Sequence, residues 1–234
     1  MRIRRAPHSW RLSPRRAVEV QRALAGRVVR FRGRCGPLQL VAGLDAAFSR
    51  DGRECVAAAV LWDVIAQRVE EQHVAARRVW FPYVPGLLSF REGPALLAAL
   101  RKLKRVPEVL MCDGQGLAHP RRFGLACHLG VITDLPAIGC AKSRLLGWAE
   151  ELGAARGANA PLVHEGEVVG LVLRTRTGVK PVYVSIGHRT DLASAAEVVL
   201  ACAVRHRLPE PTRLADRLVA AAKLTRQVPE GGGT

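Results

Sequence analysis

The sequence lacks any uninterrupted apolar run near the roughly 18 residues that a membrane span requires, because Arg, Asp or Gly breaks the longest ones. It also lacks a CxxC pair and a secretory signal. No histidines stand at zinc-ligand spacing from its six cysteines, which are at positions 35, 55, 112, 127, 140 and 202. These absences argue against membrane contact and a structural zinc site, and they predict free thiols in the reducing cytoplasm.

Acidic residues are scarce at the start of the chain. Residues 1–34 contain eleven Arg and one acid, Glu19, which gives +10 of the formal net charge of +16. Arginine forks suit bidentate phosphate contacts, so this excess predicts a polyanionic partner, in the first place nucleic acid. Genomic base composition is an alternative source of the arginines, and an organelle transit peptide is an alternative explanation of the basic start. The helical spacing of apolar residues within 14–28 favours a first helix docked on the fold instead.

What the sequence does contain is an ordinary globular mixture of 49% hydrophobic and 24% charged residues. It has no internal repeat and no linker. We therefore expect one domain over residues 1–228, acting as a monomer and followed by a disordered tail at 229–234.

The order of the apolar runs predicts an α/β fold with a mixed central sheet flanked by helices. Three successive segments joined by short turns indicate an antiparallel meander over 38–48, 55–64 and 67–79. Strands and helices then alternate, which is typical of parallel crossovers. The expected segments are helix 92–104, strand 108–113, helix 121–132, strand 137–139, a hairpin within 161–173, strand 182–186 and helices 190–205 and 211–224.

Carboxylates stand out against the basic background. Asp45 lies inside an apolar strand, where an ionised carboxylate is costly unless it is paired or bound to a cation. Asp113 ends a strand expected to be parallel, at the edge where open α/β sheets bind ligands. Strand-end caps or buried salt bridges with arginine are the alternatives for this pair. Taken alone, Glu92 is an acid at a helix N-terminus and Asp216 a solvated helix residue.

If these carboxylates converge, they form an all-oxygen ligand set, which favours Mg²⁺ or Mn²⁺ over zinc. A hard divalent ion beside a basic surface indicates phosphodiester chemistry, in which the metal activates water and stabilises the leaving oxygen. The residues alone therefore predict a metal-dependent nuclease.

Six ordered motifs strengthen this prediction. They are FPYVPGLLSFRE at 81–92, DGQG at 113–116 with HPR at 119–121, GLACHLG at 124–130, IGCAKS at 138–143, VSIGHR at 184–189 and RLPEPTR at 207–213. With these motifs the chain resembles endonuclease V, the deoxyinosine 3′ endonuclease family, from the first helix to about residue 218. The first two blocks are specific to that family.

The resemblance implies a ribonuclease-H-like fold, in agreement with the expected sheet. It also implies that Asp45 and Asp113 are the primary metal ligands, with Glu92 and Asp216 completing the acidic site directly or through water. Lys142 would then supply a fixed positive charge to a phosphate oxygen.

Two histidines, His119 and His128, would lie close to the scissile phosphate or the metals by the same resemblance. A satisfied buried imidazole is the alternative for each, and the apolar neighbours of His128 favour that alternative as much as a catalytic position. We expect His164 and His188 to be structural.

The segment 82–85 resembles the wedge of the family. Two prolines stiffen it, so that Tyr83 and Val84 can enter a base stack at a small entropic cost. The extruded base then needs a pocket, and the resemblance places hypoxanthine among backbone groups that glycines leave accessible. The substrate-binding residues expected on this basis are Pro82, Tyr83, Val84, Pro85, Gly86, Leu88, Gly114, Gly116 and Cys140. In isolation this stretch is also compatible with an exposed Pro-Gly turn.

One segment departs from the family pattern. The strand that carries the first aspartate usually reads Asp-Val-Ser-Tyr, whereas here residues 45–48 are DAAF. The change removes hydroxyls and keeps the carboxylate. We therefore expect metal binding to survive and hydrogen bonds from those hydroxyls to be lost.

The expected function is that of a Mg²⁺-dependent DNA repair endonuclease, with Mn²⁺ as a substitute. It would recognise deoxyinosine and hydrolyse the second phosphodiester bond on its 3′ side, leaving 3′-hydroxyl and 5′-phosphate ends. Cleavage of inosine-containing RNA is one alternative, since the 2′-hydroxyl separates the two substrates. A catalytically silent module that binds inosine in nucleic acid is the other.

Overall fold

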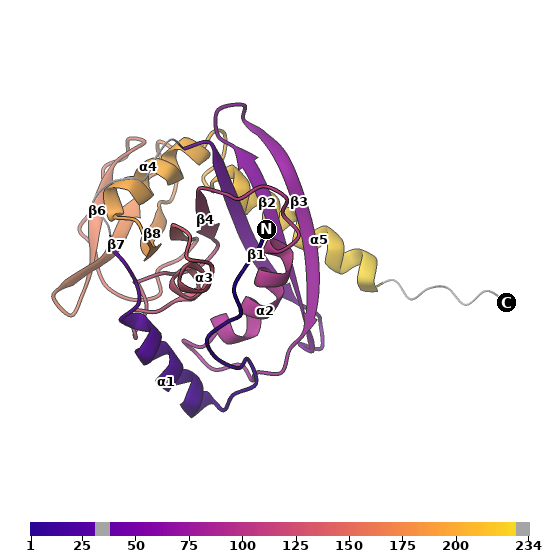
Figure 1. Cartoon of the computed structure of the whole chain (residues 1–234). Helices are drawn as coiled ribbons and strands as arrows, with labels where there is room; N and C mark the ends of the chain where they lie inside the picture. Colours follow the sequence, from indigo (N-terminus) through magenta and orange to yellow (C-terminus); the bar gives the residue numbers. More distant parts are fainter. Residues whose placement is uncertain (31–37, 228–234) are drawn as a thin grey trace.

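The structure of the chain is a computed structural model that describes residues 1–30 and 38–227, so the expected tail at 229–234 lies outside the described residues. Figure 1 shows a curved sheet with helices on both faces. The elements in chain order are α1 (Pro14–Ala25), β1 (Leu40–Phe48), β2 (Glu54–Asp63), β3 (Arg68–Arg78), α2 (Ser89–Leu100), β4 (Val109–Cys112), α3 (Leu125–Thr133), β5 (Ala137–Ala141), β6 (Asn159–His164), β7 (Glu167–Leu173), β8 (Val182–His188), α4 (Leu192–Cys202) and α5 (Glu210–Gln227).

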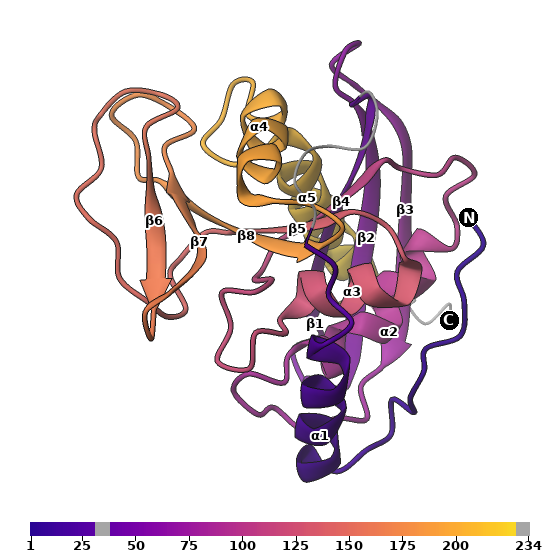
Figure 2. The same ribbon diagram turned by 60° about the vertical axis from the view of Figure 1, so that its left-hand side comes forward.

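The strands of the described residues form one mixed sheet in the order β3-β2-β1-β4-β5-β8-β7-β6. β1, β2 and β3 are an antiparallel meander, and β1, β4 and β5 are parallel neighbours. α2 and α3 lie in the connections that lead to β4 and β5. β8 returns antiparallel to β5 and carries the β6–β7 hairpin at the end of the sheet opposite β3, as Figure 2 shows. The expected mixed sheet, with its meander and parallel crossovers, is confirmed.

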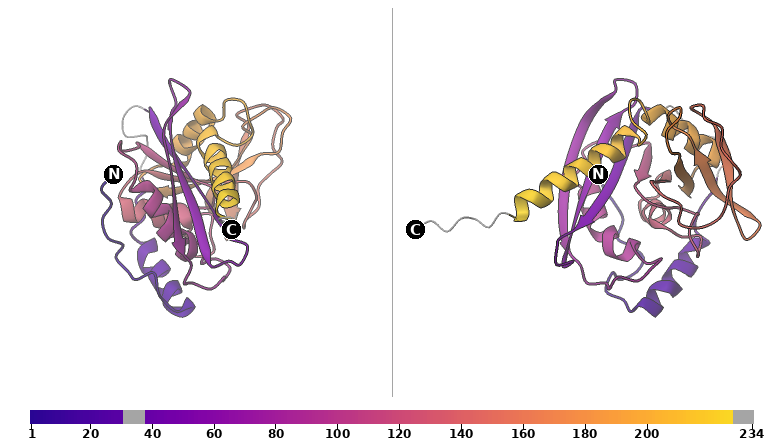
Figure 3. Two further views of the ribbon diagram at one scale, coloured as in Figure 1. Left: turned by 90° about the vertical axis from the view of Figure 1, so that its right-hand side faces the viewer. Right: turned by 180° about the vertical axis from the view of Figure 1, so that it is seen from behind.

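The two faces of the sheet follow from the alternation of side chains along each strand. Leu40, Ala42 and Leu44 of β1 pack in a cluster with α2 and α3. Val41 between them packs with α4 instead, and Ala47 packs against α5. Figure 3, in its left-hand view, shows α1, α2 and α3 on one side of the strands and α4 and α5 on the other. Odd-numbered positions of β1 therefore face the side on which α4 and α5 lie.

A glycine permits the close packing of α5 on the sheet. A Cβ built on Gly43 would lie 2.1 Å from the carbonyl carbon of Pro211, in the first turn of α5. No real side chain tolerates this separation. The backbone of α5 thus rests directly on β1, and Ala215 and Val219 complete the packing against β2.

Helix α1 begins as its sequence predicts. The Ser13 hydroxyl caps it by accepting from the Arg16 N–H, and Pro14 occupies the first helical position. Its buried face carries Ala17, Gln21 and Leu24, at i, i+4 and i+7. The helix ends at Ala25, three residues before the expected end at residue 28.

The starts of two other helices differ by three or more residues from the predicted ones. α2 begins at Ser89, three residues before the expected start at residue 92, and it contains Pro94. α3 begins at Leu125 where residue 121 was expected, because Arg122 has a left-handed φ of 52° and the segment before residue 125 is a turn. In the part of the chain that the structure describes, no helix combines the length and apolarity needed to cross a bilayer.

Candidate active site

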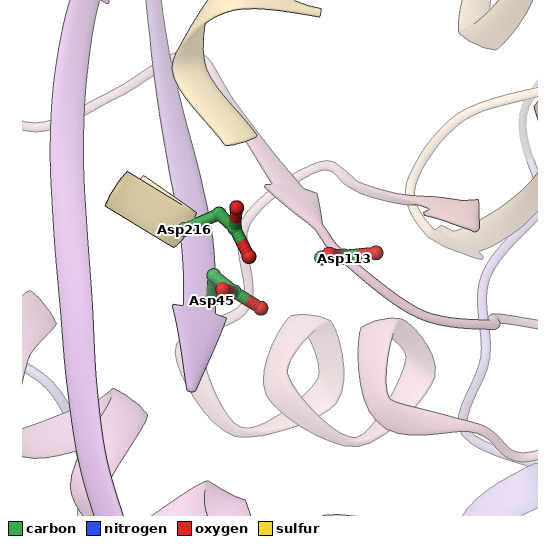
Figure 4. A group of neighbouring side chains, drawn as sticks. All are labelled: Asp45, Asp113 and Asp216. Carbon is green, nitrogen blue, oxygen red and sulfur yellow. The ribbon is translucent and has the colours of Figure 1, made fainter. Parts of the chain in front are cut away.

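Three aspartates converge from three separate elements. Asp45 lies near the end of β1, Asp113 directly follows β4, and Asp216 lies in the second turn of α5. Each offers a carboxylate oxygen, and these oxygens all lie within 4.8 Å of one another. Figure 4 shows Asp45 and Asp216 side by side with Asp113 facing them. β1 and β4 are parallel neighbours, and the Asp113 N–H donates to the Leu44 carbonyl, so the strand pairing itself brings the first two aspartates together.

Burial and the neighbouring carboxylates raise the pKa of two acidic residues of the site. Burial and the neighbouring Asp113 charge raise the pKa of Asp45 to about 7. Burial, followed by the charges of Asp45 and Asp113, raises the pKa of Glu92 to about 8. Glu92 is buried in α2, and it is not one of the three residues whose oxygens lie within 4.8 Å of one another. The structure therefore brings together three of the four expected ligands and places the fourth within electrostatic reach.

Lys142 bridges two members of the cluster. Its Nζ lies 2.7 Å from Asp113 Oδ2 and 3.3 Å from Asp216 Oδ1. Burial lowers the pKa of Lys142, but the bond to Asp113 and the surrounding carboxylates outweigh it and raise that pKa overall. Within residues 1–30 and 38–227, no arginine forms an ion pair with Asp45 or Asp113. The salt-bridge alternative with arginine is therefore not the arrangement of this site.

Lys142 is itself held by Arg207, the first residue of the 207–213 motif, to which the sequence assigned no role. Arg207 donates from Nη2 to the Lys142 carbonyl oxygen at 2.6 Å and to the Pro181 carbonyl oxygen at 2.8 Å. Arg207 lies just before α5, so one side chain links the segment after β5 to the helix that carries Asp216.

A pocket of about 420 Å³ adjoins the aspartates and shares Asp113 and Lys142 with them. Its walls come from the loop before α2, the turn after β4, the start of α3 and the segment after β5. The lining residues are Gln21, Tyr83, Val84, Pro85, Gly86, Leu88, Ser89, Asp113, Gly114, Gln115, His119, Gly124, Leu125, Ala141, Lys142, Ser143, Arg144 and Leu145. A pocket of this size, lined by apolar surface and several polar side chains, is typical of small-ligand sites.

The segment 82–86 forms one rim of that pocket. Phe81 and Leu87 on either side of it are buried, whereas Tyr83 is 71% exposed. Gly86 has a φ of +77°, which a residue with a side chain adopts only under strain. The wedge expected at residues 82–85, called the finger below, is thus a short loop with buried ends and a projecting aromatic ring.

Most of the expected substrate-binding residues reach the pocket. Tyr83, Val84, Pro85, Gly86, Leu88 and Gly114 line it, and Pro82 is exposed beside it. Gly116 does not line the pocket and supports its floor instead. A Cβ there would lie 2.0 Å from the Ile186 carbonyl oxygen, so the turn after β4 can press against β8 only with glycine at this position.

Cys140 is a correction to the expected pocket. It is buried on the face of β5 that it shares with Ile138, where both pack with Val198 and Cys202 of α4. Ala141, next along the strand, faces the pocket instead. The family motif gives a position in the chain, but strand alternation decides the face, and it turns Cys140 away.

The two expected catalytic histidines lie in different settings. His119 lines the pocket, and both of its ring nitrogens bond to the backbone: Nε2 donates to the Gly86 carbonyl at 3.0 Å, and Nδ1 accepts from the Arg121 N–H at 3.1 Å. Burial and the Arg121 charge lower the pKa of His119 to about 4. The ring is therefore neutral and fixes the loop before α2 through Gly86. Both of its nitrogens are engaged, so neither is available to bind a phosphate.

His128 corresponds to the buried-imidazole alternative. Its exposure is 0%, which excludes contact with a phosphate in this conformation. Its Nδ1 bonds to the Ser89 hydroxyl at 2.9 Å and its Nε2 to His8 Nε2 at 2.7 Å. Burial lowers the pKa of His128 well below its ordinary value. His188, expected to be structural, is buried as well.

Two residues at the pocket were not singled out from the sequence. Gln21 is 1% exposed on the apolar face of α1, and Ser89 is 2% exposed at the start of α2. For Gln21 a signal existed: a polar residue lies between Ala17 and Leu24 at the spacing of the buried stripe. Ser89 belongs to the 81–92 motif, but the expected helix started after it.

The departure at residues 45–48 is accommodated by packing. Phe48 lies beneath the Arg91 guanidinium, whose Cζ is 4.4 Å from the ring centroid. Ala47 packs against α5, and Ala46 against the cluster under α2. The missing hydroxyls are therefore replaced by apolar and cation–π contacts.

Comparisons with known proteins agree with this geometry. The family model described as Endonuclease V matches residues 22–217. An endonuclease V of Roseiflexus castenholzii is 50% identical over 221 residues, which cover 94% of this chain and 98% of that protein. The crystal structure of endonuclease V from Streptomyces avermitilis superposes with a TM-score of 0.89 at 46% identity, covering 95% of this chain and 98% of the other.

A more distant structure shares the fold. It is endonuclease V of Ciona intestinalis in complex with a 24mer DNA containing an inosine followed by a ribo-adenosine. It superposes with a TM-score of 0.77 at 24% identity, covering 89% of this chain and 97% of the other. Since one family model spans most of the chain and close relatives match it almost from end to end, the chain belongs to the endonuclease V family and is a nuclease with a ribonuclease-H-like fold.

Proposed function

We propose that this protein is a DNA repair endonuclease that recognises deoxyinosine and hydrolyses the second phosphodiester bond on its 3′ side. The products would be 3′-hydroxyl and 5′-phosphate ends. The observation that carries the proposal is that a base-sized pocket shares Asp113 and Lys142 with the cluster of aspartates. A base held in the pocket therefore keeps its own strand beside the acidic residues. The choice of lesion and the position of the cut rest on the family resemblance.

The donor set fits a hard divalent cation. Asp45, Asp113 and Asp216 offer only oxygen ligands, in a cluster tight enough to share one ion, and the raised pKa of Asp45 reflects burial and neighbouring negative charge, both of which a bound cation would offset. We propose that these three residues hold Mg²⁺, with Mn²⁺ as a substitute and with Glu92 supporting the site from α2. When bound, the metal would supply an activated water and stabilise the leaving oxygen.

The other residues of the site would bind and orient the substrate. The Lys142 ammonium, kept charged by its carboxylate neighbours, would stabilise negative charge on the phosphate. Tyr83 would enter the base stack from the stiff finger, and the pocket would enclose the extruded base. Unstacking costs a few kcal/mol and costs less for a mispaired base, which favours deoxyinosine over normal pairs.

The proposal is tested by incubating the protein with a duplex that contains a single deoxyinosine. Nicking is expected with Mg²⁺ or Mn²⁺, and the length of the labelled product should place the nick at the second bond 3′ to the lesion. No nicking is expected with EDTA. Asp113→Ala should abolish it, and a matched duplex with deoxyadenosine should stay intact. Absence of nicking with both metals, or equal activity of Asp113→Ala, would reject the proposal.

Two further arms of the same assay address the alternatives. A matched RNA that contains inosine measures the preference between DNA and RNA. Binding to the deoxyinosine duplex without metal-dependent cutting would instead indicate a silent binding module.

The finger has its own test. Because Tyr83 is 71% exposed, replacing it with alanine should leave the melting temperature within about 1 °C. We expect Tyr83→Ala to cut the deoxyinosine duplex about tenfold more slowly, while its cutting of a single-stranded oligonucleotide changes little, since no stack must be opened there.

We also propose that residues 1–228 form one domain that acts as a monomer. The continuous sheet and the helices packed on it support a single folding unit. A single cooperative unfolding transition and a sedimentation mass near 25.4 kDa are the expected results.

A further inference from the structure

One backbone carbonyl at the base of the finger accepts three hydrogen bonds. The Gly86 oxygen receives Nε2 of Gln21 at 3.0 Å, Nε2 of His119 at 3.0 Å and Nη2 of Arg121 at 2.7 Å. A carbonyl oxygen has two lone pairs, so this one is fully committed, with one of its donors charged. The three donors come from α1 and from the HPR motif, both far from the finger in the sequence.

Gln21 ties these partners together. Its amide NH₂ donates to Gly86 and also to the Phe123 carbonyl at 3.1 Å, while its Oε1 accepts from Arg121 Nε at 2.5 Å. The donors and the acceptor of the amide thus all have partners, which fixes its orientation. The side chain is 1% exposed and its helix is held by Ala17 and Leu24 on either side. It is therefore a rigid link between α1, the start of α3 and the loop before α2.

The arrangement leaves little room for the loop to shift. Gly86 is held at a φ of +77°, and a Cβ on it would lie 2.5 Å from Arg121 Nη2. Further along the finger, Val84 packs on the cluster that contains Phe81 and Leu87, whereas Tyr83 at the tip is 71% exposed. The finger is thus held at both ends, and the Tyr83 ring projects from its tip.

We propose that Gln21 is a positioning residue for the finger. Through the Gly86 carbonyl it holds residues 82–85 at the pocket rim before DNA arrives, so that little conformational entropy is lost when the finger enters the duplex. The match to the family model begins at residue 22, so Gln21 lies just outside it. The inference rests on the proposed function, since it concerns how the same pocket receives an extruded base.

The test compares duplex and single-stranded oligonucleotides that each contain one deoxyinosine. Gln21→Leu keeps the size of the side chain and removes all three hydrogen bonds. We expect its single-turnover rate on the duplex to fall about tenfold and its rate on the single strand to stay within about twofold of wild type. Gln21→Glu keeps the acceptor for Arg121 but loses the donors to Gly86 and Phe123 and places a carboxylate oxygen against their carbonyls, so its ratio of duplex to single-strand rate should fall at least as far as that of Gln21→Leu.

Leu24→Ala is the matched control. It weakens the docking of α1 through a neighbouring buried residue without touching the Gly86 carbonyl. It should lower the melting temperature while keeping the duplex to single-strand ratio of wild type. A second readout is the fluorescence of 2-aminopurine next to the lesion in EDTA, which rises when the stack opens. We expect a smaller rise with Gln21→Leu than with wild type or Leu24→Ala.

The outcomes separate this inference from the proposed function. If wild type cuts both oligonucleotides and Gln21→Leu loses activity on both by the same factor, or if Gln21→Glu and Leu24→Ala change the ratio equally, the positioning role is rejected and the proposed function stands. If wild type cuts neither, both are rejected. A variant that fails to fold is recognised by its melting curve, and Gln21→Glu then decides the question.

Discussion

Pro211 lies against Gly43 so closely that their contact sets the position of Asp216. A Cβ on Gly43 would be 2.1 Å from the Pro211 carbonyl carbon and 2.2 Å from its oxygen. Gly43→Ala therefore has to lift α5 from β1, and Asp216 moves with the helix. We expect the variant to lose roughly 2–3 kcal/mol in free energy of unfolding and most of its nicking activity, as measured by urea unfolding and the deoxyinosine assay.

Gly26→Ala controls for the loss of glycine flexibility. No atom lies within 4 Å of the Cβ that would be added there, and its φ of −67° suits any residue. This variant should match wild type in both measurements. Normal activity of Gly43→Ala would mean that α5 is not fixed by this contact.

The acidic cluster predicts how stability depends on pH when EDTA removes metal. The folded-state pKa of Asp45 is about 7, above the ordinary value of 3.8, so the folded protein holds a proton that the unfolded chain has already lost. The stability that this proton supplies is then lost as pH rises from about 4 to just above 7. Asp45→Asn removes this loss and should be more stable than wild type by roughly 1–2 kcal/mol at pH 8.5.

The measurement is urea unfolding of both proteins in EDTA at pH 5.5, 6.5, 7.5 and 8.5. The lowered pKa values of His119 and His128 make stability rise with pH in the lower part of this range, but both proteins carry these histidines, so the difference in stability between them isolates Asp45. Added Mg²⁺ should raise the stability of wild type more than that of Asp45→Asn. A stability difference between Asp45→Asn and wild type that stays constant or shrinks as pH rises across this range would contradict the prediction.

Cys140 gives a prediction that separates the core from the pocket. It packs against α4, so Cys140→Ala should cost about 1 kcal/mol of stability and leave the preference for deoxyinosine over deoxyadenosine unchanged. Leu88→Ala removes a pocket wall that is 40% exposed, and it should reduce the preference with little change in stability. Rates on the two duplexes and melting temperatures distinguish the variants. A changed preference in Cys140→Ala would place the cysteine at the base after all.

An arginine-rich surface continues from the finger. The Trp80 ring lies between the guanidinium groups of Arg11 and Arg78, at 4.0 and 4.2 Å from its centroid. These residues line a hollow of about 310 Å³ together with Arg77 and Arg91, and no acidic residue lines it. Because each phosphate contact contributes about 0.9 to the salt slope, Arg77→Ala/Arg78→Ala should lower the slope of log K against log salt by one to two.

A third arginine variant serves as the control for that experiment. Arg68 already pairs with Glu70 at 2.7 Å, so Arg68→Ala should leave the salt slope unchanged. Fluorescence anisotropy with an undamaged duplex at four salt concentrations measures both. Equal slopes for all three proteins would exclude the Trp80 surface as a phosphate contact.

The sequence predicted those parts of the molecule that depend on local pattern. Apolar runs joined by short turns located the meander, and the crossover helices followed from their apolar stripes. Asp113 could be placed because the end of a parallel strand is a known ligand position. Its proximity to Asp45 follows from one pairing, β1 with β4, which the order of elements already favoured.

Contacts between segments far apart in the chain could not be predicted from the sequence. Nothing near Asp216 indicates that its helix rests on Gly43, since a glycine in a strand has many possible reasons. The motif could not show that Cys140 lies on the far face of β5 or that His8 covers His128. Gln21 was missed because a single polar residue on a buried helix face gains meaning only when its partners, Gly86 and Phe123, are known.

Behind the pocket, the hydrogen bonds that connect His8, His128 and Ser89 determine which atom carries each proton. His8 Nδ1 faces the Ser9 carbonyl and must donate, so in the neutral ring its Nε2 accepts from His128 Nε2, and His128 Nδ1 in turn accepts the Ser89 proton. The hydroxyl of Ser89 thus donates its hydrogen to the buried His128 ring. At that point the pocket wall can receive a ligand N–H but has none to give, a polarity that suits the protonated N1 of a 6-oxopurine and opposes the bare N1 of adenine.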